Sequence, residues 1–252
     1  MAEQFPDLRL AYRDLIVEGL DRIITTQSDV LTSVRDAIAD ALAADRIIYV
    51  AGSGHSHMLA EEVFYRAGGI AAAQAILDPD LMLHQGATRS TQMERESGRA
   101  ATVLARYPLG QGDVLVIASN SGRNAYPIEL ALLAREQGAT TVALTSLAHS
   151  RQSSSRHNSG KRLFEIAEHV IDNGGDYGDS ALSIPGRRIK MGPTSTIMGV
   201  FILNALLAEA VALLAKRNIE VDVFQSANSE GAQAQLATDA LIEKWRHRII
   251  GF

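Results

Sequence analysis

Two short turns rich in serine and glycine each follow an apolar run of the sequence. Residues 52–56 (GSGHS) come after the run 47–51, and residues 120–122 (NSG) come after the run 114–118. Apolar residues at helical spacing follow both turns. A strand that ends in small polar residues and opens into a helix leaves backbone N–H groups and hydroxyls pointing outward, where the helix dipole favours an anion. The two turns therefore predict a phosphate cradle built from two strand ends.

A structural interpretation competes with this one, because serine and glycine also make tight strand-to-helix loops and cap helices. For one turn alone, the structural interpretation is the better one. Two such turns at successive positions of one parallel sheet favour an anion site.

The elements that must position these turns are short β-branched runs, which alternate with helical segments after Asp45. The predicted strands are Arg46 to Ala51, Ile70 to Leu77, Asp113 to Ser119, Thr140 to Thr145 and His169 to Asp172. Such alternation predicts a parallel sheet covered by helices on both faces. Open parallel sheets bind ligands outside the carboxyl ends of their strands, so the edge that carries both turns is the expected ligand site.

Helical periodicity extends around this sheet. It predicts one or two amphipathic helices in residues 7–44, a helix from Gln92 to Tyr107, and a polar helix from Glu230 to His247. The segment from Ile197 to Ala215 is almost wholly apolar and long enough to cross a bilayer. Because Glu209 lies within it, we interpret this segment as a buried core or interface helix, not as a membrane span.

Composition narrows the class of protein. The 252 residues are 46% hydrophobic and 21% charged, which is ordinary for a globular chain with a sizeable core. The net charge of −5 argues against a general nucleic-acid or anionic-membrane surface, because both need an excess of lysine and arginine. The absence of cysteine excludes a disulfide framework and a cysteine nucleophile. The first ten residues show no secretory signal, so we expect a cytoplasmic protein that holds any anion locally.

The two turns resemble the signatures of the sugar isomerase (SIS) domain. Residues 52–56 fit Gly-x-Gly-x-Ser, and residues 119–124 (SNSGRN) nearly fit Ser-x-Ser-Gly-x-(Thr/Ser). The similarity covers about residues 45–215, and residues 145–173 look like an uncharacterised, phosphoheptose-isomerase-like branch. The resemblance implies an α/β fold in which helices sandwich a five-stranded parallel sheet of flavodoxin-like type. It also implies a phosphosugar at the carboxyl ends of the strands, often against a neighbouring subunit.

In this family the second turn grips the phosphate and the first turn contacts the sugar. When these family roles are transferred to the matching positions of this chain, the implied binding residues are Gly54, Ser56, Ser119, Asn120, Ser121, Gly122 and Asn124. The departure from the family pattern is Asn124, where threonine or serine is usual. An amide still donates to a phosphate oxygen, but it is longer than a hydroxyl. Arg123 is free to add a charge-assisted contact, with simple solvation as its alternative.

Isomerisation between an aldose phosphate and a ketose phosphate needs a base for the proton beside the carbonyl and an acid for its oxygen. Glu62 occupies a position where some sugar-isomerising SIS domains carry a functional glutamate, and His55 lies in the first turn. We predict that these two residues are catalytic, with a surface carboxylate as the alternative for Glu62. His55 and His57 diverge on a turn and no further ligand completes a set, so we predict no metal.

Phosphoheptose isomerases carry a glutamate in the first-motif helix and a histidine on the last long helix. This chain has Arg66 near the first position and no histidine between His169 and His247, so that chemistry does not transfer with the fold. Three functions stay open: an isomerase acting through an enediol(ate), which we prefer, an ether lyase, and a non-catalytic phosphosugar sensor. Since His57 stands where a dinucleotide motif needs its third glycine, we predict no cofactor.

The apolar helices exceed what one five-stranded sheet can cover, which favours a homodimer or homotetramer over packing within one monomer. The expected organisation is an N-terminal helical segment at 1–44, a SIS domain at 45–215, and a C-terminal tail with a helix at 216–252. The expected partner is a small sugar phosphate, without nucleic acid or membrane.

Overall fold

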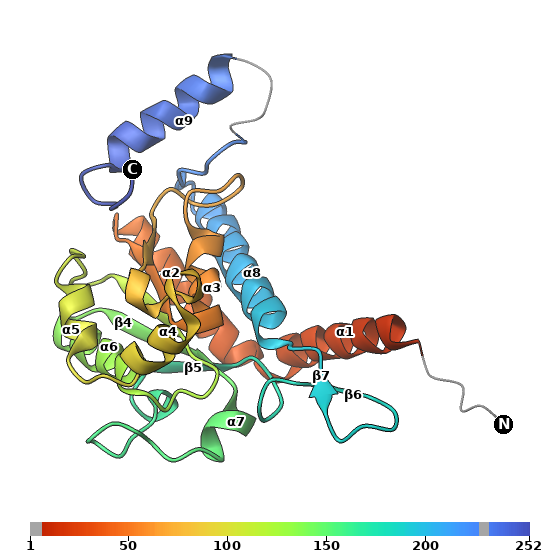
Figure 1. Ribbon diagram of the computed structural model, residues 1–252. Helices are drawn as coiled ribbons and strands as arrows, with labels where there is room; N and C mark the ends of the chain where they lie inside the picture. Colours follow the sequence, from red (N-terminus) through yellow and green to blue (C-terminus); the bar gives the residue numbers. More distant parts are fainter. Residues whose placement is uncertain (1–6, 227–231) are drawn as a thin grey trace.

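The computed structural model describes residues 7–226 and 232–252. Residues 1–6 of the predicted N-terminal segment and residues 227–231 of the predicted C-terminal tail therefore lie outside the described residues. Figure 1 shows a central sheet with helices packed around it and the long helix α8 (Ser195–Lys216) along one side.

Five parallel strands form the central sheet, in the order β2-β1-β3-β4-β5. They are β1 (Ile48–Gly52), β2 (Ala73–Ile76), β3 (Val114–Ala118), β4 (Thr140–Thr145) and β5 (His169–Asp172). All five predicted strands are confirmed, with small shifts at their ends. The chain passes from β1 to β2 on one side and then crosses to β3 on the other. The strand order therefore reverses between β1 and β3, where the register pairs Gly52 with Ala118.

Helices cover both faces of the sheet, as the resemblance implied. One face packs against α1 (Leu8–Thr26), α2 (Ser28–Ala43), α3 (His57–Val63) and α8. The other face packs against α5 (Arg99–Leu104) and α6 (Ala125–Glu136), and buried Trp245 at the end of α9 (Ala232–Trp245) joins the same cluster. The helical pattern in residues 7–44 thus forms two helices, which meet at Gln27.

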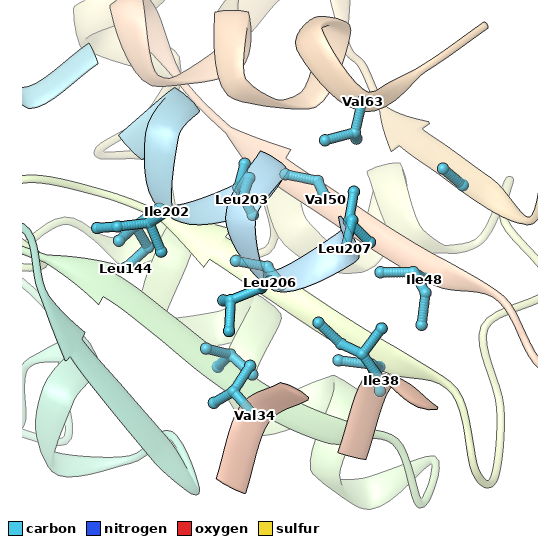
Figure 2. Packing of buried hydrophobic residues seen from close by; sticks show 14 of the residues in the cluster. Val34, Ile38, Ile48, Val50, Val63, Leu144, Ile202, Leu203, Leu206 and Leu207 are labelled. Atoms are coloured by element: carbon cyan, nitrogen blue, oxygen red, sulfur yellow. The ribbon is translucent and has the colours of Figure 1, made fainter. Parts of the chain in front are cut away.

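The strands are apolar along their whole length because both of their faces are buried. Within β1, Ile48 and Val50 enter the cluster under α2 and α8, while Tyr49 and Ala51 enter the opposite cluster. Figure 2 shows the first cluster, in which side chains of α2 and α8 meet those of the sheet. Burial of this apolar surface is the main stabilising term of the fold.

Helix α8 is long and apolar enough to cross a membrane by length and composition, and it is the one such helix among the described residues. One of its faces packs into the first core cluster through Ile202, Leu203 and Leu206. The polar residues within it, Asn204 and Glu209, are exposed. The interpretation as a core helix is therefore confirmed for that face.

The single helix predicted from Gln92 to Tyr107 is wrong. The structure has α4 (Ala87–Met93) and α5, which are separated by a short connection that ends at Gly98. Gly98 takes a left-handed φ of 86°, and its N–H donates to both carboxylate oxygens of Glu129 at 3.0 and 2.9 Å. This acceptor lies 31 residues further along the chain, whereas the glycine at position 98 was a local signal that the apolar periodicity outweighed.

Residues 246–252 return to the edge of the sheet at β2. The backbone N–H of Ile250 donates to Gln74 Oε1 at 2.6 Å, and Gln74 Nε2 donates to the carbonyl of Ile250 at 3.2 Å. The ring of Phe252 stacks on Phe64 with 5.5 Å between centroids. This part of the chain therefore covers an edge strand that would otherwise be open to pairing with other chains.

Candidate functional site

The first turn folds back tightly on the end of β1. The short η1 helix (Gly54–Ser56) leads directly into α3. A Cβ at Gly52 would lie 2.4 Å from the carbonyl oxygen of Ser56, so only glycine permits this reversal. Gly54 has a left-handed φ of 56°. The turn places Ser56 over the carboxyl edge of the sheet and leaves the His55 side chain exposed.

The second turn joins β3 to α6 through residues 119–124. Gly122 has a left-handed φ of 56°, and a Cβ there would lie 3.1 Å from Cβ of Leu163. The Gly122 N–H donates to Ser119 Oγ at 3.3 Å. Within the described part of the chain, no hydrogen bond is donated by the backbone N–H of Asn120, Ser121 or Arg123, nor by the Ser121 hydroxyl. These groups are the ones that an anion at this turn would use.

Neighbouring strand ends hold the second turn in place. The carbonyl of Asn120 accepts from Thr145 Oγ1 and from the N–H of Ser146, both at 3.1 Å. Its side-chain oxygen accepts from Asn173 Nδ2 at 2.9 Å. Thr145 ends β4 and Asn173 follows β5. Three successive strand ends therefore fix the conformation of this turn.

Both turns line one small cavity at the carboxyl edge of the sheet. Its polar lining residues are Ser56, Ser119, Asn120, Asn173, Ser195 and Thr196. The volume is about 10 Å³, which is room for about one water molecule. The cavity is therefore too small to enclose a phosphate group. The structure thus brings Ser56 of the first turn together with Ser119 and Asn120 of the second.

The start of α8 is held over this cavity by Asp179. The Asp179 carboxylate accepts from the N–H groups of Thr194 and Ser195, both at 3.0 Å, and from Ser195 Oγ at 2.6 Å. Sequence reasoning did not place Asn173, Ser195 or Thr196 in the site. A signal existed for Asn173, because it follows β5 as Ser119 follows β3.

Glu62 lies on α3 but does not line the cavity. Its Oε1 accepts from Asn204 Nδ2 of α8 at 2.9 Å and pairs with the guanidinium of Arg66. His55 is exposed, and no hydrogen bond of its side chain occurs among the described residues. The two predicted catalytic residues therefore flank the first turn and do not converge on the cavity in this conformation.

Two other histidines, His57 and His149, lie near the turns. His57 is buried, with Nδ1 against the carbonyl of Gly54 and Nε2 3.6 Å from a carboxylate oxygen of Glu61. Its ring centroid is 6.2 Å from that of His84. Among the described residues, no group of three or more His, Cys, Asp or Glu side chains is placed to hold a metal ion.

His149 lies on the short helix α7 (Leu147–Arg151) next to the 173–194 segment. Its ring is 4.8 Å from that of Tyr177, and its Nδ1 is buried without a partner in the described structure. Burial lowers the pKa of His149, with Arg123 acting in the same direction and Asp179 opposing it. The lowered pKa favours the uncharged imidazole, the form that accepts a proton.

Asn124, the residue that departs from the family pattern, is buried and does not cap α6 with its side chain. Its Oδ1 accepts from Arg156 Nη1 at 2.9 Å. The backbone N–H of Arg156 donates to the carbonyl of Arg123 at 2.8 Å, and Arg123 Nη2 donates to Ser154 Oγ at 3.0 Å. The structure thus brings Arg156 to the second turn. No local signal predicted this contact, since 32 residues separate the two side chains.

Comparisons with known proteins agree with this architecture. A family model described as the SIS domain matches residues 11–146, which include most of the N-terminal helices. A UPF0309 protein of Listeria monocytogenes serotype 4b is 42% identical over 238 residues, covering 94% of this chain and 96% of that protein. A UPF0309 protein of Geobacillus thermodenitrificans is 43% identical over 238 residues, covering 94% and 95%.

Two solved structures of phosphoheptose isomerases share the fold. The one from Neisseria gonorrhoeae aligns with a TM-score of 0.53 at 16% identity, covering 82% of this chain and 98% of its own. The one from Francisella tularensis aligns with a TM-score of 0.56 at 14% identity, covering 81% and 96%. At such low identity these likenesses establish the fold alone.

Proposed function

The chain belongs to the SIS domain family, and from that membership we propose that it binds a sugar phosphate and interconverts its aldose and ketose forms. The observation that carries the proposal is the meeting of the two turns at the point where the strand order reverses. Serine hydroxyls and unbonded backbone N–H groups gather there, beside the N-terminus of α6. Open parallel sheets bind ligands at this position.

The reaction needs only proton transfers once the phosphate is held. A base removes the proton from the carbon beside the carbonyl, which leaves an enediol(ate), and an acid protonates the carbonyl oxygen. The proton then returns to the former carbonyl carbon, while the deprotonated acid takes the proton of the neighbouring hydroxyl, which becomes the new carbonyl. We assign these transfers to Glu62 and His55, because both lie on the turn and helix that carry Ser56. No electron acceptor takes part, so the proposal includes no redox cofactor.

The charge and composition of the chain bear on its binding partner and its compartment. The net charge of −5 argues against a nucleic acid or an anionic membrane as the partner, and the partner that we propose is a small sugar phosphate. We place the protein in the cytoplasm, where sugar phosphates are available as substrates.

The proposal is tested by thermal-shift measurements with hexose, hexosamine, pentose and heptose phosphates and their unphosphorylated parents, followed by deuterium-exchange NMR on each stabilising compound. We expect stabilisation by a phosphorylated sugar alone, with deuterium entering beside the carbonyl. Product analysis then separates isomerisation from loss of a substituent by a lyase. Stabilisation without exchange by any of these sugars would favour the sensor, and no phosphate-dependent shift would overturn the proposal.

We further propose that the protein is a homodimer that buries the outer face of α8. A groove of about 330 Å³ runs between α1, α2 and α8 and includes Ile24, Leu31 and Phe201 in its lining. Arg35 and Glu209 also line the groove. Because these two side chains have opposite charges, a two-fold related copy presents a complementary surface to the same groove.

Ile24→Glu is expected to halve the mass measured by size-exclusion chromatography with light scattering. Ile24 is 50% exposed in the described chain, so a glutamate is tolerated by the monomer but is costly in a dry interface. Leu236→Glu is the matched control, since Leu236 is 66% exposed on α9 and does not line the groove. A wild-type protein that is monomeric at micromolar concentration would contradict this interface, whereas a tetramer would add a second one.

A further inference from the structure

Three arginines, Arg95, Arg123 and Arg156, lie near the start of α6, where positive charge outweighs the negative charge of Glu94. Among the described residues, no ion pair involves Arg95, Arg123 or Arg156. Burial lowers the pKa of Arg156, and the charges of Arg123 and Arg95 lower it further, with only Glu94 opposing. All three remain cations, because arginine does not lose its proton in proteins. Positive charge is therefore concentrated here beyond what the neighbouring residues neutralise.

The position of these arginines at a helix N-terminus adds to the excess of positive charge. The carbonyl of Glu94 accepts from the N–H of Tyr126 at 3.1 Å, which brings residues 94 and 95 to the first turn of α6. That turn contains no acidic side chain. The N-terminus of a helix repels cations and attracts anions, so three arginines at this place are unfavourable unless an anion joins them. Arg123 Nε is also buried without a partner in the described structure.

Asn124 connects this cluster to the phosphate-binding turn. It is buried, has extended backbone angles as the N-cap of α6, and makes no capping bond with its side chain. Its amide oxygen is instead occupied by Arg156 Nη1 at 2.9 Å. A hydroxyl at position 124 is too short to make the same contact, since Oδ1 of asparagine lies one bond further from the backbone.

We propose that Asn124 is a positioning residue that holds Arg156 beside the 119–124 turn, so that Arg156 and Arg123 supply the positive charge of the phosphate site. The inference rests on the proposed function, because it concerns the same site. Charge-assisted hydrogen bonds from a guanidinium to a phosphate are stronger than bonds from neutral donors. The site therefore selects a phosphate monoester in its doubly charged form over a phosphodiester or a neutral sugar.

The test uses inorganic phosphate as the probe, with binding measured by calorimetry on the full chain. Arg156→Met is expected to weaken phosphate binding by about tenfold. Arg151→Met is the matched control, because Arg151 is exposed, its side chain makes no hydrogen bond among the described residues, and the charge change is the same. Equal affinity of Arg156→Met and the wild type would overturn the inference, as would an equal loss in Arg151→Met.

A pH series separates a charge contribution from a purely structural one. Phosphate gains its second charge as pH rises from about 5.5 to about 8, near the second ionisation of a phosphate group. The wild type is expected to bind more tightly across this range, and Arg156→Met is expected to gain less. Arg156→Lys should keep most of the pH dependence but not the full affinity, since lysine lacks the planar fork. An unchanged pH dependence in Arg156→Met would overturn the role of Arg156.

Asn124→Ala examines the positioning role. If Asn124 acts by holding Arg156, the double variant Asn124→Ala/Arg156→Met binds phosphate as weakly as Arg156→Met alone. Fully additive losses would show that Asn124 does not act through Arg156. Should Arg156→Met fail to fold, shown by its circular dichroism melting curve, Arg156→Lys and Asn124→Ala provide the same comparison.

The failure of this inference can be distinguished from failure of the proposed function. If Ser119→Ala/Ser121→Ala abolishes phosphate binding and Arg156→Met does not change it, the turn is the site and the arginines have no part in it. If neither variant changes phosphate binding, the phosphate site itself is placed wrongly and the proposed function falls with it.

Discussion

Replacing Ser119 and Ser121 together with alanine is expected to lower the affinity for the stabilising sugar phosphate by at least about 100-fold. A hydrogen bond to a charged group contributes about 1.5–3 kcal/mol, and tenfold in affinity corresponds to about 1.4 kcal/mol. Two such bonds are lost in the double variant. The measurement is calorimetric titration with the sugar phosphate that gives the largest thermal shift, and with its unphosphorylated parent.

The single variants Ser119→Ala and Ser121→Ala separate the loss of a ligand contact from a change in the turn itself. Ser121 has no partner for its hydroxyl in the described structure, so Ser121→Ala removes a ligand contact without disturbing the fold. Ser119 accepts from the N–H of Gly122 at 3.3 Å, and Ser119→Ala therefore also loosens the turn. Ser33→Ala, at an exposed position of helix α2, controls for the loss of a hydroxyl elsewhere. Undiminished affinity in the double variant would place the phosphate outside this turn.

Glu62→Gln is expected to slow deuterium exchange beside the sugar carbonyl by about 10²–10⁴-fold, the range that removal of an acid–base group produces. Affinity for the sugar phosphate should change little, because the phosphate is held by the second turn. Glutamine also keeps an oxygen that accepts from Asn204, so the contact between α3 and α8 survives. The readout is the NMR exchange rate at saturating ligand.

Glu61→Gln is the matched control for this variant. It removes one negative charge from the adjacent residue of α3, whose carboxylate is near His57 and not near Asn204. If Glu62→Gln exchanges at the wild-type rate, the Glu62 carboxylate serves the ion pair with Arg66 and not proton transfer. His55→Gln, measured in the same way, examines the second assigned role.

The fold was largely predictable because each strand has a recognisable local sequence pattern. A strand buried on both faces needs an unbroken apolar run, and Val114–Ala118 and Ile48–Gly52 both have one. The glycines of the turns are equally local requirements, since Gly54 and Gly122 both adopt left-handed backbone angles. The helix predicted over residues 92–107 was wrong because Gly98 breaks it with a left-handed φ, and Glu129, which is remote in sequence, accepts the freed N–H.

Within the site, the sequence by itself determined where the serine–glycine turn of residues 119–124 lies, between β3 and α6. A strand, a serine–glycine turn and a helix form one continuous segment, so the place of this turn at the carboxyl end of β3 follows from the local pattern. Its conformation is fixed by contacts with residues at the ends of β4 and β5. The sequence predicted Ser56, Ser119 and Ser121 as binding residues, and of these Ser56 and Ser119 line the cavity.

The tertiary structure alone decided which charged and polar side chains join that segment. Arg156 reaches Asn124 across 32 residues, and Asn204 reaches Glu62 across 142. Asn173 and Ser195 enter the cavity because β5 pairs with β4 and α8 packs against one face of the sheet. A side chain's partners depend on how separate elements pack, and packing is fixed by the burial of the whole core and not by any local pattern.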